Sequence, residues 1–393
     1  MIYLDNSATT PMAPEVIERI AEVRADAFGN ASSVHRVGQR ARAMLDESRE
    51  ALARILAAEP REIIVTSGGT EANNAAIKGY ALACRLREHV WPTIITARTE
   101  HHAVLGPTEH LERLGASVRY VDVDGAGRTT PDALRTALEG VDRTVAPLVS
   151  LMHANNETGA VNPIAELSAV ARECGALVHC DAVQSFGKVP VEPRALGVDM
   201  LSLTAHKLHG PRGVGLLWLR KEIEIEPLMH GGSQERNRRG GTEAVELVAG
   251  LALAARLALD QLDASAARMQ WLCDRLHAGI VATIDGVRTI TPRDTSLPNI
   301  LSITFDDAAE LDGEALIVGM DLRGVAVSNG SACTSGSPQP SHVLLAMGLP
   351  PEQARAAVRF SLSRYTSEAE IDAAIVALGE VVRTLRGARM AKG

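Results

Sequence analysis

Short apolar runs alternate with segments of helical period between Glu62 and about Leu219. The runs are EIIVTSGG, TIITAR, SVRYVDV, TVAPLVSLMHA, ALVHCDAV, DMLSLTAHK and VGLLWLR. Strands this apolar are expected where helices cover both faces of a sheet, so the pattern predicts an α/β fold with a mostly parallel, seven-stranded sheet. In such sheets the functional residues gather in loops outside the carboxyl ends of the strands.

A different pattern follows an Ala/Leu-rich helical stretch that runs from about Glu243 to Leu276. Strand-like LPNILSITF, VAVSN and AAVRFSLSR alternate with the helical segments DGEALIVGM, PSHVLLAMG and SEAEIDAAIVALGEVVRTLRG. This order predicts a smaller α+β domain. We place the large α/β domain at residues 15–260 and the smaller domain at residues 1–14 and 261–393, with Cys333 in the Gly/Ser-rich loop SNGSACTSGSPQPS.

Composition narrows the class of protein. A chain of 393 residues predicts two or three domains, and a net charge of −8 gives no general electrostatic reason to bind nucleic acid or an acidic membrane surface. Its five cysteines include no CxxC pair, which argues against a disulfide framework and a structural zinc site and favours a reducing compartment. The start of the chain has no secretory signal, and the most apolar run, 247–259, is too short to span a bilayer. We therefore expect a cytoplasmic protein.

A glycine turn in SGGTEANN, residues 67–74, separates an apolar strand from a helix. Glycines let backbone N–H groups approach an anion, and a helix N-terminus adds partial positive charge, so the turn is a candidate phosphate site. The alternative is a tight strand-to-helix turn capped by Thr70, with Glu71 in the first helical turn. Local sequence favours the two interpretations equally.

Asp181 and Lys207 each come at the end of an apolar run, in HCDAVQS and TAHKLHGPRG. A carboxylate at the end of a buried strand needs a cation or a donor, which a structural salt bridge or a protonated heterocyclic nitrogen could supply. A strand-end lysine is usually solvated, but in a dry, cation-rich pocket it can attack an aldehyde. Together the two residues suggest a pyridoxal phosphate site.

Two further segments carry candidate chemistry. His101 and His102 in TEHHAV form a poor chelate if extended; one of them could cap a helix, cover a cofactor ring or move protons. Cys333 in GSACTSG has little apolar cover, which favours a reactive thiol there. The other cysteines sit in apolar or helical patterns and are expected to be packing residues; these are Cys84, Cys174, Cys180 and Cys273.

The ordered set of motifs resembles the cysteine desulfurases of the class V aminotransferase group. It consists of LDNSATTP, FGNASSVH, TSGGTEANN, TEHHAV, MHANNETG, HCDAVQS, AHKLHGPRG, GGSQERNRRGGT, PNILS, SNGSACTSGSPQPSHVL and VRFSLSRY. The likeness runs from about Ile2 to the last helix. It implies a homodimer of pyridoxal phosphate fold type I that removes sulfur from L-cysteine, releases L-alanine and leaves a persulfide on an enzyme cysteine.

The resemblance also implies roles for individual residues. Lys207 would hold the cofactor aldehyde and then act as a base at the substrate α-carbon. Asp181 would pair with the pyridinium nitrogen, Gln184 with the phenolic oxygen, and His101 would stack on the ring and assist proton transfer. Cys333 matches the nucleophile. The remaining matches are cofactor and phosphate contacts at Gly69, Thr70, Thr204, His206 and Thr242, the last from the partner subunit, and substrate contacts at Asn156 and Arg359.

The Cys333 loop resembles the long-loop branch, which hands its persulfide to a separate acceptor protein. Two departures stand out: Ala205 replaces the usual glycine before His206, and the chain ends at LRGARMAKG without the longer tail that some members use to dock a scaffold. The sulfur acceptor therefore stays open among iron–sulfur cluster assembly, tRNA thiolation and DNA sulfur modification. We expect no membrane or nucleic acid partner.

Other functions remain open at this point. A selenocysteine lyase or another class V carbon–sulfur lyase would keep the same cofactor, and a non-enzymatic scaffold would keep only the fold. A metal hydrolase is disfavoured because the histidines come without a helix-spaced His/Glu cluster. We expect no metal site, with Cys333 as the one candidate ligand for a cluster.

Overall fold

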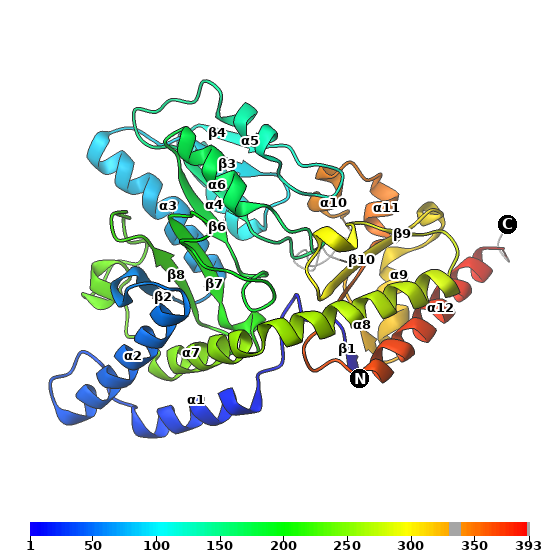
Figure 1. Cartoon of the computed structure of the whole chain (residues 1–393), viewed down its shortest axis with the longest axis horizontal. Helices are drawn as coiled ribbons and strands as arrows, with labels where there is room; N and C mark the ends of the chain where they lie inside the picture. Colours follow the sequence, from blue (N-terminus) through cyan, green and yellow to red (C-terminus); the bar gives the residue numbers. More distant parts are fainter. Residues whose placement is uncertain (330–338, 391–393) are drawn as a thin grey trace.

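The computed structural model describes residues 1–329 and 339–390, with side chains described as far as residue 387. Figure 1 shows two parts: a large sheet flanked by helices, and a smaller assembly of strands and helices that holds both ends of the chain. None of the described helices is long and apolar enough to cross a lipid bilayer.

The large sheet has seven strands in the order β2-β8-β7-β6-β5-β3-β4. Neighbours from β7 to β4 run parallel, while β8 is antiparallel to both β7 and β2. The predicted mostly parallel, seven-stranded sheet is confirmed. The strands are β2 (Ile63–Thr66), β3 (Ile94–Ala97), β4 (Val118–Val121), β5 (Leu148–Met152), β6 (Leu177–Asp181), β7 (Met200–Thr204) and β8 (Gly215–Leu219).

Helices cover both faces of this sheet, which explains why its strands are so apolar. On one face α3 (Gly69–Glu88) and α4 (His102–Arg113) pack in one hydrophobic cluster with Ile64, Ile94 and Leu148. The alternate strand residues enter a second cluster on the other face. The helices of that cluster are α1 (Pro14–Asp26), α2 (Arg36–Ile55), α5 (Pro131–Leu138), α6 (Ile164–Glu173) and α7 (Val245–Asp260).

The smaller part has its own hydrophobic cluster, which includes Leu4 from the start of the chain. Its antiparallel sheet has the order β12-β10-β9, and β1 pairs in parallel with β11. The strands are β1 (Ile2–Tyr3), β9 (Val287–Thr289), β10 (Ile300–Phe305), β11 (Val325–Ala326) and β12 (Val358–Ser361). The helices are α8 (Leu262–Thr283), α9 (Gly313–Asp321), α10 (His342–Ala346), α11 (Pro351–Arg355) and α12 (Glu368–Met390).

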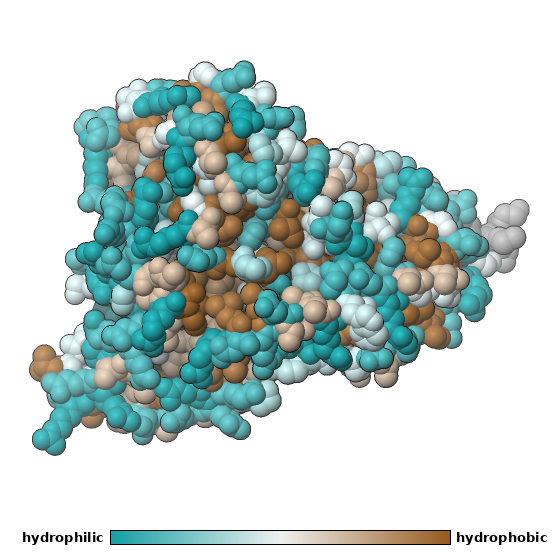
Figure 2. Space-filling view, in the orientation of Figure 1, coloured by the Kyte–Doolittle hydropathy of each residue, from teal (hydrophilic) through white to brown (hydrophobic). Residues whose placement is uncertain are grey.

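The helical stretch expected from Glu243 to Leu276 is divided in the structure. It forms α7 and α8, which join at Gln261, and α8 continues to Thr283. The buried side chains of α7 belong to the large-sheet cluster, whereas those of α8 belong to the smaller one. The two helices, which follow one another nearly end to end in Figure 1, therefore contribute to different cores. Figure 2 shows this face of the molecule as mostly hydrophilic, with hydrophobic side chains gathered near its middle.

Candidate active site

One cavity of about 340 Å³ lies at the carboxyl ends of strands β2, β3, β5, β6 and β7. All of the candidate side chains except Arg359 reach it because each ends one of these strands or follows it within a few residues, as the rule for parallel sheets requires. The predicted residues that line it are Gly69, Thr70, His101, Asn156, Asp181, Gln184, Thr204, His206, Lys207 and Arg359. Residues distant in the sequence are therefore brought to a single site.

Asp181, the last residue of β6, is 6% exposed. Its Oδ2 accepts a hydrogen bond from Asn73 Nδ2 at 2.6 Å, and its Oδ1 accepts one from the Val183 backbone N–H at 2.9 Å. Burial raises the pKa of this carboxyl, and the two donors together with nearby His101 and Lys207 oppose the rise. Among the described residues no cation lies within ion-pair distance of Asp181, so the expected alternative of a structural salt bridge is wrong.

The N-terminal segment lies against Lys207. The Lys207 ammonium donates hydrogen bonds to the carbonyl oxygens of Ser7 and Ala8, the latter at 2.7 Å. Thr10 ties the same segment to the loop after β7, because its backbone N–H and its hydroxyl both donate to the His206 carbonyl. Residues near the start of the chain thereby form one wall of the cavity.

The glycine turn supplies a second wall. Gly68 is the N-cap residue of α3, with φ of +156°, and a Cβ on Gly69 would lie 2.7 Å from Val183 Cγ2. Only a glycine allows the backbone to approach the Val183 side chain this closely. Thr70 makes no capping hydrogen bond, so the cap expected from it is wrong. Instead, the Glu71 carboxylate accepts one hydrogen bond from the Ser67 backbone N–H at 2.7 Å and another from Arg239 Nε at 2.9 Å.

His101 is the N-cap residue of α4 and also lines the cavity. Its Nδ1 accepts the Ala103 backbone N–H at 3.0 Å, which in a neutral ring leaves the proton on Nε2. Burial lowers the pKa of His101, Asp181 opposes this, and Lys207 adds to it. His102 instead lies outside the cavity, exposed, with its ring centroid 4.6 Å from that of His342.

His206 and Gln184 complete the polar lining. Burial lowers the pKa of His206 to about 4, and its Nδ1 lies 3.2 Å from the Thr9 hydroxyl, so the ring is neutral at pH 7. Gln184 donates from Nε2 to the Ser7 carbonyl at 2.8 Å. Its buried Oε1 has no hydrogen-bond partner within the described residues.

Arg359 on β12 enters the cavity from the smaller part, and its side chain is 3% exposed. Its Nη1 donates to the Asn156 carbonyl at 2.7 Å and its Nη2 to Asp5 at 2.6 Å. The buried Nε has no acceptor in the described part of the chain, which leaves one donor for a ligand.

Two predicted residues are not seen at this cavity. Thr242 is exposed and does not line it, although the same segment approaches α3 through the Arg239–Glu71 ion pair. Cys333 lies outside the described residues. The other cysteines are half-buried or buried, as expected for packing residues, and residues 1–329 and 339–390 contain no cluster of His, Cys, Asp or Glu fit for a metal ion.

Sequence reasoning assigned no role to three residues that support the site. Asn73 donates a hydrogen bond to Asp181, and the Ser7 carbonyl accepts hydrogen bonds from both Lys207 and Gln184. Asp5 forms an ion pair with Arg359. Their motifs, LDNSATTP and TEANN, were visible in the sequence. Which partner each residue meets depends on contacts across 100 residues or more, which no local pattern shows.

Comparison with known proteins agrees with this geometry. Residues 2–374 match the family model "Aminotransferase class-V". A cysteine desulfurase IscS from Dictyoglomus turgidum is 44% identical over 386 residues, which are 98% of this chain and 95% of the relative. The chain belongs to the cysteine desulfurase family. A solved NifS-like protein superposes with a TM-score of 0.89 at 36% identity, covering 98% of this chain and 99% of that one.

A second solved structure that is similar to this cysteine desulfurase is SspA in complex with cysteine. It has a TM-score of 0.80 at 33% identity and covers 93% of this chain and 100% of its own. The family likeness thus extends over both the large sheet and the smaller part. It confirms the resemblance on which the expected fold type rests.

Proposed function

We propose that this protein is a pyridoxal phosphate-dependent cysteine desulfurase, which converts L-cysteine to L-alanine and transfers the sulfur to Cys333. The observation that carries the proposal is the environment of Asp181: a buried carboxylate that opens on a cavity, accepts two hydrogen bonds and has no cation within ion-pair distance among the described residues. A protonated ring nitrogen would supply the missing positive charge.

Three features of the cavity fit pyridoxal phosphate. Asp181 provides a carboxylate for the ring nitrogen, and the unpartnered Gln184 Oε1 provides a polar atom beside it. Gly69 lines the cavity in the first turn of α3, where backbone N–H groups and the helix dipole favour a phosphate. When bound, the cofactor withdraws electrons from the substrate α-carbon. Thr70, Thr204 and His206 would complete its binding site, and Thr242 would reach the site of the partner subunit in a homodimer.

Lys207 would hold the cofactor aldehyde and exchange a proton at the substrate α-carbon. Its ammonium already points to the Ser7 and Ala8 carbonyls, which accept its hydrogen bonds and so fix its direction. Neutral His101, with Nδ1 occupied by the cap of α4, presents a proton on Nε2. We infer that it donates that proton at the substrate and takes one back at the same atom.

Arg359 would bind the carboxylate of L-cysteine, together with Asn156. A guanidinium held by Asp5 and the Asn156 carbonyl keeps its orientation before the substrate arrives, which lowers the entropy cost of binding. Cys333 as thiolate would then take the substrate sulfur as a persulfide and pass it to an acceptor protein.

We also propose that the chain divides into a large domain, residues 15–260, and a smaller domain, residues 1–14 and 261–393. We propose a cytoplasmic location for the protein.

The test compares wild-type protein with Lys207→Ala, Cys333→Ser and the surface control Lys221→Met. We expect yellow wild-type protein, borohydride-stable attachment of the cofactor at Lys207, and loss of both attachment and alanine production in Lys207→Ala. Cys333→Ser should keep the colour and lose sulfur transfer to a thiol acceptor. A colourless wild type that still forms alanine would refute the cofactor assignment, and unchanged transfer by Cys333→Ser would refute the nucleophile.

A further inference from the structure

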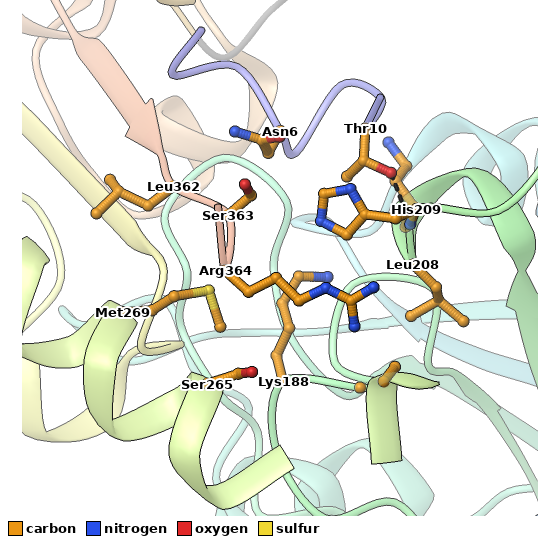
Figure 3. Close-up of a pocket in the computed structure, with 13 residues that line it drawn as sticks. Asn6, Thr10, Lys188, Leu208, His209, Ser265, Met269, Leu362, Ser363 and Arg364 are labelled. Atoms are coloured by element: carbon orange, nitrogen blue, oxygen red, sulfur yellow. Dashed lines mark hydrogen bonds between the residues drawn. The ribbon is translucent and has the colours of Figure 1, made fainter. Parts of the chain in front are cut away.

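A second, smaller cavity adjoins the candidate active site on the other side of the N-terminal segment. Its volume is about 30 Å³, and it shares Lys207 with the larger cavity. The walls come from the N-terminal segment, the loops after β6 and β7, the helices α7 and α8, and the residues that follow β12 (Figure 3). By the same measure of cavity volume, a single water molecule needs roughly 10–15 Å³. The cavity therefore has room for no more than a few small molecules.

Two cationic side chains converge on this cavity in Figure 3. Lys188 is 7% exposed, and its one acceptor in the described part of the chain is the Gln184 carbonyl at 2.8 Å. Arg364 donates from Nη1 to the Leu257 carbonyl and from Nη2 to the Tyr365 hydroxyl. The Arg364 Nε is buried and has no acceptor among the described residues. Unused donors of both residues are thus available.

No carboxylate balances these charges. No Asp or Glu lines the cavity, and neither Lys188 nor Arg364 has a carboxylate within ion-pair distance in residues 1–329 and 339–390. Burial lowers the pKa of Lys188 to about 7, with a further contribution from Lys207. Burial also lowers the pKa of His209 to about 4, and Arg364 and Lys188 add to that shift. A buried charge without a partner is costly, so the cavity favours an anion.

We propose that this cavity binds one small monovalent inorganic anion of the size of chloride. Lys188 Nζ and Arg364 Nε supply the charge, and the hydroxyl groups of Ser265 and Ser363, which also line the cavity, supply further donors. The small volume excludes a second ion and disfavours larger anions. This site is separate from the carboxylate and phosphate positions proposed for the larger cavity, and it does not depend on that function.

Thermal unfolding of the protein as purified, cofactor included, tests the proposal. Melting temperatures are compared in sodium chloride and sodium gluconate at equal ionic strength for wild type, Lys188→Met and the exposed control Lys221→Met. At a chloride concentration of about 100 times Kd, the ratio of folded to unfolded protein rises about 100-fold. We expect chloride to raise the melting temperature of wild type and Lys221→Met by the same few degrees. Lys188→Met should lose that difference.

Equal chloride effects in wild type and Lys188→Met, or no chloride effect in wild type, would refute the site. Crystals grown in sodium bromide give an answer even if Lys188→Met does not fold. We expect an anomalous bromide peak within hydrogen-bond distance of Lys188 Nζ. A cavity with ordered water and no anomalous signal would show instead that Lys188 is neutral there, and the proposal would be wrong.

Discussion

Arg359 Nη2 lies 2.6 Å from Asp5 Oδ1 and so joins the smaller sheet to the N-terminal segment. The two side chains are 3% and 20% exposed, so the pair is largely shielded from water. Because Nη1 is held by the Asn156 carbonyl at the same time, the guanidinium cannot rotate freely. The position of the proposed substrate-binding residue is therefore set by a residue from the opposite end of the chain.

The first prediction concerns this pair. Asp5→Asn leaves the buried Arg359 charge without a carboxylate, and breaking such a pair by removing one partner costs about 3 kcal/mol. We expect lower stability in urea unfolding and a KM for L-cysteine raised about tenfold, a loss of about 1.4 kcal/mol of binding, with a smaller change in kcat. A larger fall in kcat than rise in KM would contradict the role in positioning Arg359.

A matched control is the exposed pair between Arg275 and Asp372. Their side chains are 40% and 51% exposed at a separation of 2.8 Å. Asp372→Asn removes the same kind of carboxylate, but exposed pairs contribute only about 0.2–1 kcal/mol. We expect a small change in stability and no change in KM, so that the effects of Asp5→Asn can be assigned to the site.

A second prediction separates the two roles of His101. Asparagine is a good N-cap residue, whereas alanine loses about 1 kcal/mol of cap stability. His101→Asn should therefore unfold like wild type, and His101→Ala should be less stable by about that amount. Both should lose alanine production, because neither carries a ring proton. His35→Ala removes a similar cap, in which His35 Nδ1 accepts a hydrogen bond from the Gly38 backbone N–H. Its loss of stability shows how much of the loss in His101→Ala comes from the cap alone. Activity kept by His101→Asn would exclude a proton-transfer role.

A third prediction uses two glycines that differ in the space around them. An added Cβ at Gly69 would lie 2.7 Å from Val183 Cγ2, whereas one at Gly106, which is exposed on α4, meets no atom within 4 Å. We expect Gly69→Ala to weaken pyridoxal phosphate binding by about 5- to 150-fold, since overpacking costs about 1–3 kcal/mol. Gly106→Ala should raise stability by up to about 1 kcal/mol and leave cofactor affinity unchanged. Fluorescence titration of the apoprotein measures both affinities.

A fourth prediction concerns the pH dependence of stability through Glu157. This carboxyl accepts a hydrogen bond from the Ser341 hydroxyl, and burial raises its pKa from 4.5 to about 7. Between those values the folded state holds a proton that the unfolded state has released. The stabilising contribution of this group is thus complete below pH 4.5 and is lost as the pH rises through 7, a loss of about 3 kcal/mol.

Glu157→Gln removes this titration. Urea unfolding at pH values between 4 and 8 gives the free energy of unfolding of both proteins. We expect the difference between them, wild type minus variant, to fall as the pH rises. The same pH slope in both proteins would show that Glu157 titrates alike in the folded and unfolded states.

The amino-acid sequence by itself determined the strands of the large sheet and the chemistry at their ends. Apart from the edge strand β4, which is mostly half-buried, each strand is buried on both faces and so had to be a short apolar run. Such runs are visible without any knowledge of their neighbours. For the same reason Asp181 and Lys207 were recognisable as polar residues at the ends of buried strands. These are local properties, encoded within ten or so residues.

Only the tertiary structure decided which groups meet. The division of one apolar helical stretch into α7 and α8, the pairing of Asp5 with Arg359 and the absence of a described cation at Asp181 all depend on long-range packing. The placement of Lys188 and Arg364 around one small cavity depends on long-range packing as well. Periodicity reports whether a residue is buried, but the partner of a buried charge is set by chain segments hundreds of residues away.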